Sequence, residues 1–264
     1  MILELKKTSG LELNLDTEKA KLILASGIHF SEPAVRTIDE MREVLMDKKL
    51  SSPKDLYYMY RDVHLETDSA LLEKNKLRYD VTVIKPDPLG KELMKTAGHY
   101  HPGSFGELYE VVAGRGFCML QRPDVSDHTI IKEVIVVEAK AGQKIVIPPG
   151  FGHILINPGP DNLVTSNWVS SVFKSEYDLY KKAQGAAYFM VKAALGTEFI
   201  ANSYFKRNAE IKFVKPSAKL EKFGLAEGEP IYPLVRKNAA KLDFLNRPLD
   251  FDYADCFITA DPKK

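Results

Sequence analysis

The sequence predicts an all-β fold, either a barrel or a two-sheet sandwich, for the main part of the chain. Short runs rich in aromatic and β-branched residues recur from Leu56 to Trp168, among them LRYDVTVI, TIIKEVIVV and HILIN. Gly, Pro, Asp or Asn separates these runs, and no long helical pattern lies between them. Many short strands joined by turns favour a sandwich or jelly-roll barrel over a parallel α/β sheet. We therefore expect a β-core that spans roughly residues 56–170.

Ahead of this core, residues 1–55 predict short strands and one helix that pack on the barrel. Ser31 and Pro33 are typical of a helix start, and the helix should end before Leu50-Ser51-Ser52-Pro53. Its expected apolar face consists of Val35, Ile38, Met41, Val44 and Leu45.

Residues 56–205 are expected to hold the barrel, the site and a following helix and hairpin. The segment Lys174 to Gln184 predicts a helix closed by Gly185. The next stretch, AAYFMVKAALGTEFIANSYF, is compatible with a helix or with a hairpin that turns at Leu195-Gly196, and we favour the hairpin. Residues 206–264 predict a mixed extension, a strand-like IKFV with two helix-like pieces, that wraps the barrel or a neighbouring subunit.

Composition argues against two classes of partner. Lys plus Arg total 37 against 36 for Asp plus Glu, so a net charge of +1 gives no electrostatic reason to expect nucleic acid or an anionic membrane. No apolar stretch of about 18 residues occurs, and the N-terminus lacks the apolar segment of a secretory signal. We therefore expect a cytoplasmic protein.

Three histidines and a glutamate have the spacing of a metal site. Residues two apart in a strand point to the same side, so His99 and His101 can both face the barrel interior. A loop then leads to Glu107, and the turn at 148–150 precedes His153. Imidazole and carboxylate groups hold divalent transition metals. We expect these four side chains to converge on one cation.

The same residues resemble the motifs of the cupin superfamily, a small double-stranded β-helix. The second cupin motif, G-x5-P-x-G-x2-H-x3-N, is matched at every fixed position, namely Gly142, Pro148, Gly150, His153 and Asn157. The resemblance implies a cupin jelly roll, here with N-terminal strands and helix and a mixed C-terminal extension.

The first cupin motif, G-x5-H-x-H-x3,4-E-x6-G, is matched with two departures. No glycine stands six residues before His99, and five residues separate His101 from Glu107. The end of the motif, Glu107-x6-Gly114, is intact. The longer loop leaves Glu110 as an alternative carboxylate ligand.

The delayed glutamate resembles the archaeal-type phosphoglucose isomerases, cupins with T-x-G-H-x-H followed by E-x-Y. That pattern stands here as Thr96-Ala97-Gly98-His99-Tyr100-His101 and Glu107-Leu108-Tyr109, and the resemblance runs from about Tyr57 to Tyr204. It implies that His99, His101, Glu107 and His153 are the metal ligands, that Thr82, Thr96, Gly98 and Tyr60 hold the sugar phosphate, and that Tyr109 lines the substrate pocket.

Two features of the sequence complicate the assignment of the family's residue roles to this chain. Simple alternation puts Thr96 and Gly98 on the face opposite His99, so a bulge or turn near Ala97-Gly98 must re-aim the chain. A histidine and a tyrosine of the family are replaced by Ser175 and Val169. The role of these two positions is therefore left open.

The chemistry implied is aldose–ketose isomerisation of glucose 6-phosphate and fructose 6-phosphate, a step of glycolysis and gluconeogenesis. Moving a proton between C1 and C2 forms an anion that a metal stabilises as a Lewis acid. Glu107 is the expected catalytic residue, as ligand, base, or both in turn, because a carboxylate near a metal is held ionised. A hydride shift between C1 and C2 is the alternative to this proton transfer. By analogy the metal is Fe²⁺, with Mn²⁺, Ni²⁺ or Zn²⁺ able to occupy the same site.

Two other functions use the same residues. Three histidines with a carboxylate also serve cupin dioxygenases, and a non-catalytic sugar-binding or regulatory cupin would use the C-terminal extension as an interaction module. The T-x-G and E-x-Y patterns favour the isomerase. Barrels of this kind often pair through sheet edges, so we expect a homodimer.

Overall fold

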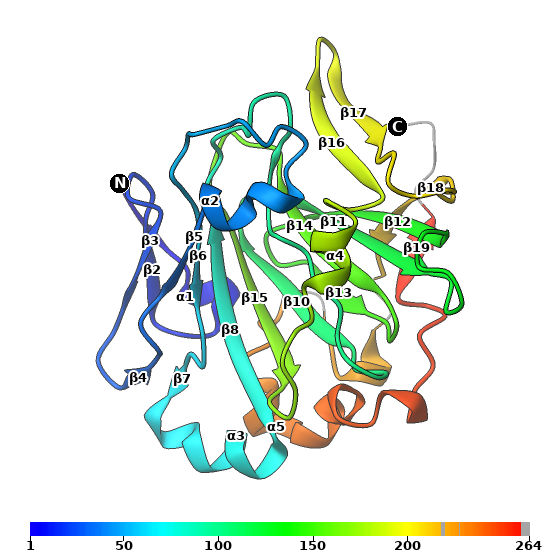
Figure 1. Cartoon of the computed structure of the whole chain (residues 1–264). Coiled ribbons are helices and arrows are strands. Elements are labelled where there is room, and N and C mark those ends of the chain that lie inside the picture. The colour runs from blue at the N-terminus through cyan, green and yellow to red at the C-terminus, as the bar shows by residue number, and fades with distance from the viewer. Residues whose placement is uncertain (218–219, 227, 260–264) are drawn as a thin grey trace.

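The computed structural model describes residues 1–217, 220–226 and 228–259 and has the predicted all-β architecture (Figure 1). Two six-stranded sheets build the barrel. The first sheet has the order β13 (Lys144–Ile147), β10 (Glu107–Ala113), β15 (Leu163–Ser170), β8 (Leu77–Ile84), β6 (Asp55–Tyr60) and β5 (Ala34–Thr37). The second has the order β19 (Phe257–Thr259), β18 (Ile211–Pro216), β12 (Ile131–Lys140), β11 (Arg115–Pro123), β14 (Gly152–Asn157) and β9 (Met94–Lys95).

The remaining elements are small. The short strands are β1 (Ile2–Glu4), β2 (Leu13–Asp16), β3 (Lys21–Leu24), β4 (Ile28–His29), β7 (His64–Leu65), β16 (Tyr188–Ala193) and β17 (Gly196–Ala201). The α-helices are α1 (Lys6–Ser9), α2 (Ile38–Met41), α3 (Ser69–Asn75), α4 (Asp178–Lys182) and α5 (Leu234–Asn238). Turns of 3-10 helix lie at Arg42–Val44, Glu66–Asp68, Glu221–Phe223, Ala239–Leu245 and Pro248–Asp250. Among the described residues, none of the helices has the length and apolarity needed to span a membrane.

Strand alternation divides the first sheet into two faces. On β8, Tyr79, Val81 and Val83 point into an outer core, whereas the residues between them, such as Asp80 and Thr82, line a cavity on the inner side. The period of two along a strand produces this separation. The inner face can therefore carry polar groups while the outer face is buried.

The N-terminal and C-terminal segments cover the outer face. Leu13 and Leu15 of β2 and Phe223 and Phe244 of the C-terminal extension join the same buried cluster as β8. Trp168 of β15 is fully buried there, and its indole Nε1 donates a hydrogen bond to the carbonyl of Ile231 at 2.9 Å. Both terminal segments thus contribute to the core of the barrel sheet.

The extension also enlarges the second sheet. The predicted strand IKFV is confirmed as part of β18, which pairs with β12 in parallel while the other pairs of that sheet are antiparallel. Both β5 and β18 join the barrel sheets from outside the predicted bounds of 56–205. The division at those bounds stays a prediction, and residues 218–219, 227 and 260–264 of the predicted extension lie outside the described part.

The helix predicted from Ser31 to Leu50 is wrong over its first part. Residues 34–37 form β5, in which Val35 pairs with Tyr58 and is partly exposed. The helix begins only after Thr37, whose hydroxyl accepts the N–H of Glu40 while the Glu40 carboxylate accepts the N–H of Thr37. This reciprocal capping box sets the start of α2, and the Thr37-x-x-Glu40 signal stood in the sequence.

The segments after the barrel agree more closely with expectation. The predicted hairpin is confirmed, because β16 and β17 pair antiparallel up to Ala193 and Gly196 and project from the barrel (Figure 1). The predicted helix from Lys174 to Gln184 is shorter and starts later, as α4. Gly185 follows it with a φ of +134°.

Candidate metal centre and substrate cavity

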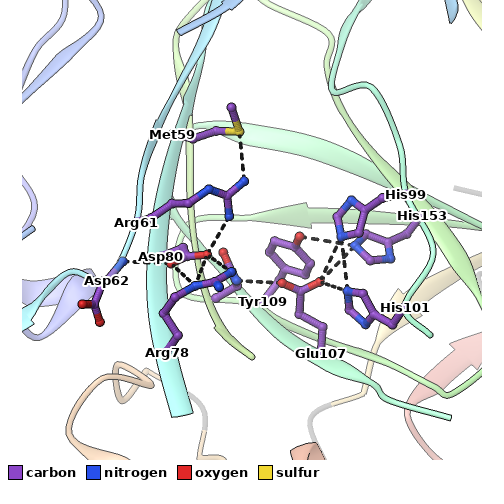
Figure 2. Close-up of polar contacts among 11 residues, drawn as sticks. Met59, Arg61, Asp62, Arg78, Asp80, His99, His101, Glu107, Tyr109 and His153 are labelled. Atoms are coloured by element: carbon purple, nitrogen blue, oxygen red, sulfur yellow. Dashed lines mark hydrogen bonds and ion pairs between the residues drawn. The ribbon is translucent and has the colours of Figure 1, made fainter. Parts of the chain in front are cut away.

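Four predicted ligand side chains converge in the barrel (Figure 2). His153 lies on β14 and Glu107 begins β10, whereas His99 and His101 follow β9. The backbones of His99 and His153 exchange two hydrogen bonds of 3.3 and 3.1 Å, which fixes the two imidazoles on neighbouring segments. One ligand atom from each of the four residues lies within 4.8 Å of the others.

The distances fit a shared cation. Glu107 Oε2 lies 3.0 Å from His153 Nε2, 3.4 Å from His101 Nε2 and 3.8 Å from His99 Nε2. Ligands about 2.0–2.2 Å from one metal, at tetrahedral or octahedral angles, are roughly 3–3.5 Å apart. Within the described residues, Glu107 Oε2 is buried without a hydrogen bond of suitable geometry. Such an orphaned buried oxygen is what a cation would satisfy.

The ionisation of these groups also suits a metal. Burial holds the pKa of His99 well below its ordinary value and lowers that of His153, so both rings are neutral. Burial acts to raise the pKa of Glu107, but the adjacent His101 and His153 outweigh it and hold that pKa well below its usual range. Neutral imidazoles and an ionised carboxylate are the forms that bind a divalent metal.

Neighbouring side chains orient the ligands. Asn167 on β15 donates from Nδ2 to Glu107 Oε1 at 2.6 Å, which leaves Oε2 facing the histidines. The Tyr109 hydroxyl lies 3.3 Å from His153 Nε2. Asn167 was missed at the sequence level, although it pairs directly with Tyr109 across β10 and β15. Only knowledge of that strand pairing would have identified it.

A cavity adjoins the four ligands, and most of the predicted substrate contacts line it. Thr82, Thr96, Gly98 and Tyr109 face this space together with His99 and Glu107. Val169 and Ser175, the positions where the family residues are replaced, line it as well. Lining residues that the sequence did not single out include Tyr57, Arg61, Arg78, Asp80 and Tyr177.

Gly98 forms the turn that the sequence analysis expected near Ala97-Gly98. Its φ of +77° lies in the left-handed region, and a Cβ there would stand 2.4 Å from Ile154 Cγ2 and 2.6 Å from Tyr180 Cε1. Only glycine, which has no Cβ, both adopts this φ readily and fits the space beside Ile154 and Tyr180. The chain is re-aimed here, so that Thr96 and His99 reach the same cavity.

Tyr60 lies elsewhere. It belongs to the outer core, where its hydroxyl accepts the N–H of Leu22 at 2.9 Å. Alternation along β6 directs Tyr57 into the cavity in its stead, and the Tyr57 hydroxyl accepts the N–H of Ala97 at 3.1 Å. Tyr60 was predicted to contact the sugar phosphate, but it does not lie with the other predicted site residues.

The alternative ligand Glu110 also lies away from the histidines. Its carboxylate is 3.1 Å from Lys144 Nζ and accepts the N–H of Ile231 at 2.9 Å. Burial raises the pKa of Glu110 to about 7. Glu110 thus ties β10 to the C-terminal extension, and Glu107 is the carboxylate of the candidate metal centre.

The family model and the similar sequences agree on one family. Residues 34–205 match the family model described as glucose-6-phosphate isomerase (GPI). The glucose-6-phosphate isomerase of Thermococcus gammatolerans is 26% identical over 168 residues, which cover 61% of this chain and 78% of that protein. That of Thermococcus litoralis is 28% identical over 147 residues, which cover 53% and 70%.

Solved structures that match are more distant. They include procruciferin, an 11S globulin from Brassica napus, with 14% identity, a TM-score of 0.35 and coverage of 55% of this chain and 30% of that one. The capsular polysaccharide assembling protein CapF from Staphylococcus aureus matches with 21% identity, a TM-score of 0.33 and coverage of 47% and 29%. Because the family model spans more than half of the 264 residues, the chain belongs to the glucose-6-phosphate isomerase family.

Proposed function

We propose that this chain is a metal-dependent isomerase that interconverts glucose 6-phosphate and fructose 6-phosphate in the cytoplasm, as a step of glycolysis and gluconeogenesis. The observation that carries the proposal is the convergence of three imidazoles and an ionised carboxylate beside a cavity. Family membership supports the isomerase activity, and the donor set supports the metal. Fe²⁺ is the proposed ion, with Mn²⁺, Ni²⁺ or Zn²⁺ as substitutes.

His99, His101, Glu107 and His153 would hold the metal, which would supply Lewis-acid stabilisation of negative charge on the substrate oxygens. Glu107 takes the proton from C2 of the aldose, and the C2–H electron pair forms a C1–C2 double bond while the C1–O π pair moves to O1. As O1 gains a proton and O2 loses one, C2–O becomes the carbonyl of the ketose, and the C1–C2 π pair takes a proton from Glu107 at C1. Burial holds the pKa of Tyr109 well above its ordinary value, so its hydroxyl stays protonated and can donate to the substrate oxygen. His99, His101 and His153 serve as ligands and take no proton.

The phosphate group is proposed to bind at Thr82, Thr96 and Gly98. Thr96 Oγ1 accepts the N–H of Leu155 at 3.0 Å, so its own hydroxyl proton remains available to an anion. These residues line the same cavity as His99 and Glu107, so one sugar phosphate could contact both groups. A homodimer remains a prediction that light scattering can check.

The variant His153→Ala tests the assignment of the ligands. Because His153 supplies one of the four converging atoms, we expect the variant to fold and to lose its metal together with its isomerase activity. The matched control is His128→Ala, since His128 is exposed and belongs to no such cluster among the described residues. A variant that retains stoichiometric metal would refute this ligand set.

Solvent isotope exchange tests the proton route. Isomerisation in D₂O should place deuterium at C2 of glucose 6-phosphate, because a proton held on Glu107 can exchange before it returns. Product without deuterium would point to direct hydride transfer between C1 and C2. Oxygen uptake with a small organic acid, in place of isomerisation, would instead show a cupin dioxygenase.

A further inference from the structure

A cluster of two arginines and one aspartate lies on the wall of the cavity formed by β6 and β8 (Figure 2). Arg78 and Asp80 alternate with buried apolar residues on β8 and share a face with Thr82. Arg61 directly follows β6 and reaches the same carboxylate. None of the three belongs to the motifs that relate this chain to its family.

Arg78 and Asp80 form a locked pair. Arg78 Nε donates to both carboxylate oxygens of Asp80 at 2.9 and 3.1 Å, and Nη2 donates to Oδ2 at 2.9 Å. The Asp80 side chain is only 6% exposed and also accepts the N–H of Asp62 at 3.0 Å. The charge of Arg78 is therefore neutralised by a buried, fully hydrogen-bonded partner.

Arg61 is held more loosely. It donates a single hydrogen bond to Asp80, from Nη1 to Oδ2 at 3.1 Å, and its Nη2 contacts the Met59 sulfur at 3.5 Å. Thioether sulfur is a weak acceptor. In the described part of the chain, Arg61 Nε has no hydrogen-bond partner, and the side chain is 39% exposed. With Asp80 already paired to Arg78, the β6–β8 wall keeps one excess positive charge, since the other carboxylate among the described lining residues, Glu107, lies on β10.

The position of this charge is set by the strand register. Met59 pairs with Thr82 across β6 and β8, and Asp80 precedes Thr82 by two residues on the same face. A guanidinium that touches both Met59 and Asp80 therefore lies beside Thr82. The hydroxyls and backbone at Thr82, Thr96 and Gly98 supply hydrogen bonds, but they carry no charge to balance a phosphate dianion.

We propose that Arg61 is the cationic contact for the phosphate of the substrate and that the Asp80–Arg78 pair positions it. A planar guanidinium can present two parallel N–H groups to a phosphate. Arg61 keeps N–H groups for this purpose, because it makes one hydrogen bond to Asp80 and one weak contact with Met59. This inference rests on the proposed function for the identity of the substrate. The phosphate contact itself can be measured without any turnover.

The experiment compares the metal-loaded protein with Arg61→Met, which keeps the length of the side chain and removes its charge. The probe is inorganic phosphate, measured by calorimetry, followed by the kinetics of glucose 6-phosphate. We expect the phosphate Kd and the KM to rise about 10-fold or more, with kcat and metal content little changed, because the variant loses a charge-assisted hydrogen bond to the phosphate. Unphosphorylated glucose should bind equally to both proteins.

Two further variants complete the design. Arg115→Met is the matched control, since Arg115 pairs with Glu138 at 3.1 Å and lies outside this cavity. Arg61→Lys keeps the charge but loses the planar guanidinium with its paired N–H donors. Its phosphate Kd should therefore fall between those of the wild type and Arg61→Met. If Arg61→Met does not fold, the comparison of Arg61→Lys with wild type, expected to be at least about threefold weaker, replaces it.

An unchanged phosphate Kd in Arg61→Met would overturn the inference, because it would leave Arg61 only an ion pair with Asp80. Failure of the proposed function gives a different result. In that case the wild type would bind phosphate through Arg61 and yet isomerise no sugar phosphate.

Discussion

The two faces of β8 show how one strand serves two purposes. The inner face presents Arg78, Asp80 and Thr82 to the cavity, and the outer face buries Tyr79, Val81 and Val83 under the terminal segments. The charged groups Arg78 and Asp80 are tolerated on the inner face because they hydrogen-bond to each other. The outer face supplies apolar burial. Changes on the inner face should therefore alter chemistry, and changes on the outer face should alter stability.

The largest expected effect is on the inner face, in the variant Glu107→Gln. The loss of the carboxylate charge should lower kcat by about 10²–10⁴-fold, the range for a general base. Glu138→Gln is the control, because Glu138 is exposed on β12. Activity within tenfold of wild type would exclude Glu107 as the base.

The outer face gives the reverse pattern in Trp168→Ala. Trp168 is 0% exposed and its ring stacks on Tyr232 with centroids 5.7 Å apart. Its truncation should lower the free energy of unfolding by about 3–5 kcal/mol. The kcat of the folded fraction should stay near the wild-type value. A loss below about 1 kcal/mol would show that the C-terminal extension packs less closely than described.

Gly98→Ala tests the point where backbone geometry serves the inner face. The left-handed φ and the contacts with Ile154 and Tyr180 should together cost about 1–3 kcal/mol of stability, and substrate binding should weaken. Gly142→Ala separates the two causes, since Gly142 has a φ of +86° but nothing within 4 Å of its Cβ position. Equal effects of the two changes would mean that crowding at Gly98 is unimportant.

The smallest effect concerns Glu110, which joins β10 to the extension. Its pKa is raised from 4.5 to about 7 in the folded chain. A raised pKa favours the folded state below the unfolded value, and that contribution is lost as pH rises through the folded value. Stability should thus fall between pH 4.5 and about 7 more steeply in wild type than in Glu110→Gln, whose amide still accepts the N–H of Ile231. If the free energies of unfolding of the two proteins changed equally with pH across this range, the raised pKa of Glu110 would be refuted.

The ligands of the candidate metal centre could be predicted from the sequence more completely than the residues around them. Motif spacing located His99, His101, Glu107 and His153, because a metal site needs fixed ligand types at positions that a β-barrel brings together. The choice of Tyr60 over Tyr57 depended on which face of β6 turns inward. Local sequence cannot decide this when both faces are buried.

Other features were readable only in part. The alternation of Arg78, Asp80 and Thr82 is visible in LRYDVTVI, but its partner Arg61 follows a different strand and needs the register of β6 and β8. The C-terminal extension was predicted to wrap the barrel, whereas the parallel pairing of β18 with β12 depends on contacts remote in sequence. Long-range pairing of this kind leaves no periodic signal.

The central claim is that one divalent cation, held by three imidazoles and a carboxylate, enables sugar-phosphate isomerisation. Metal analysis of the purified chain, combined with an isomerase assay before and after chelation, tests it most directly. We predict about one metal per chain, loss of activity on chelation, and recovery when Fe²⁺ or Mn²⁺ is added back. Isomerisation that persists in protein shown to be free of metal would contradict the account.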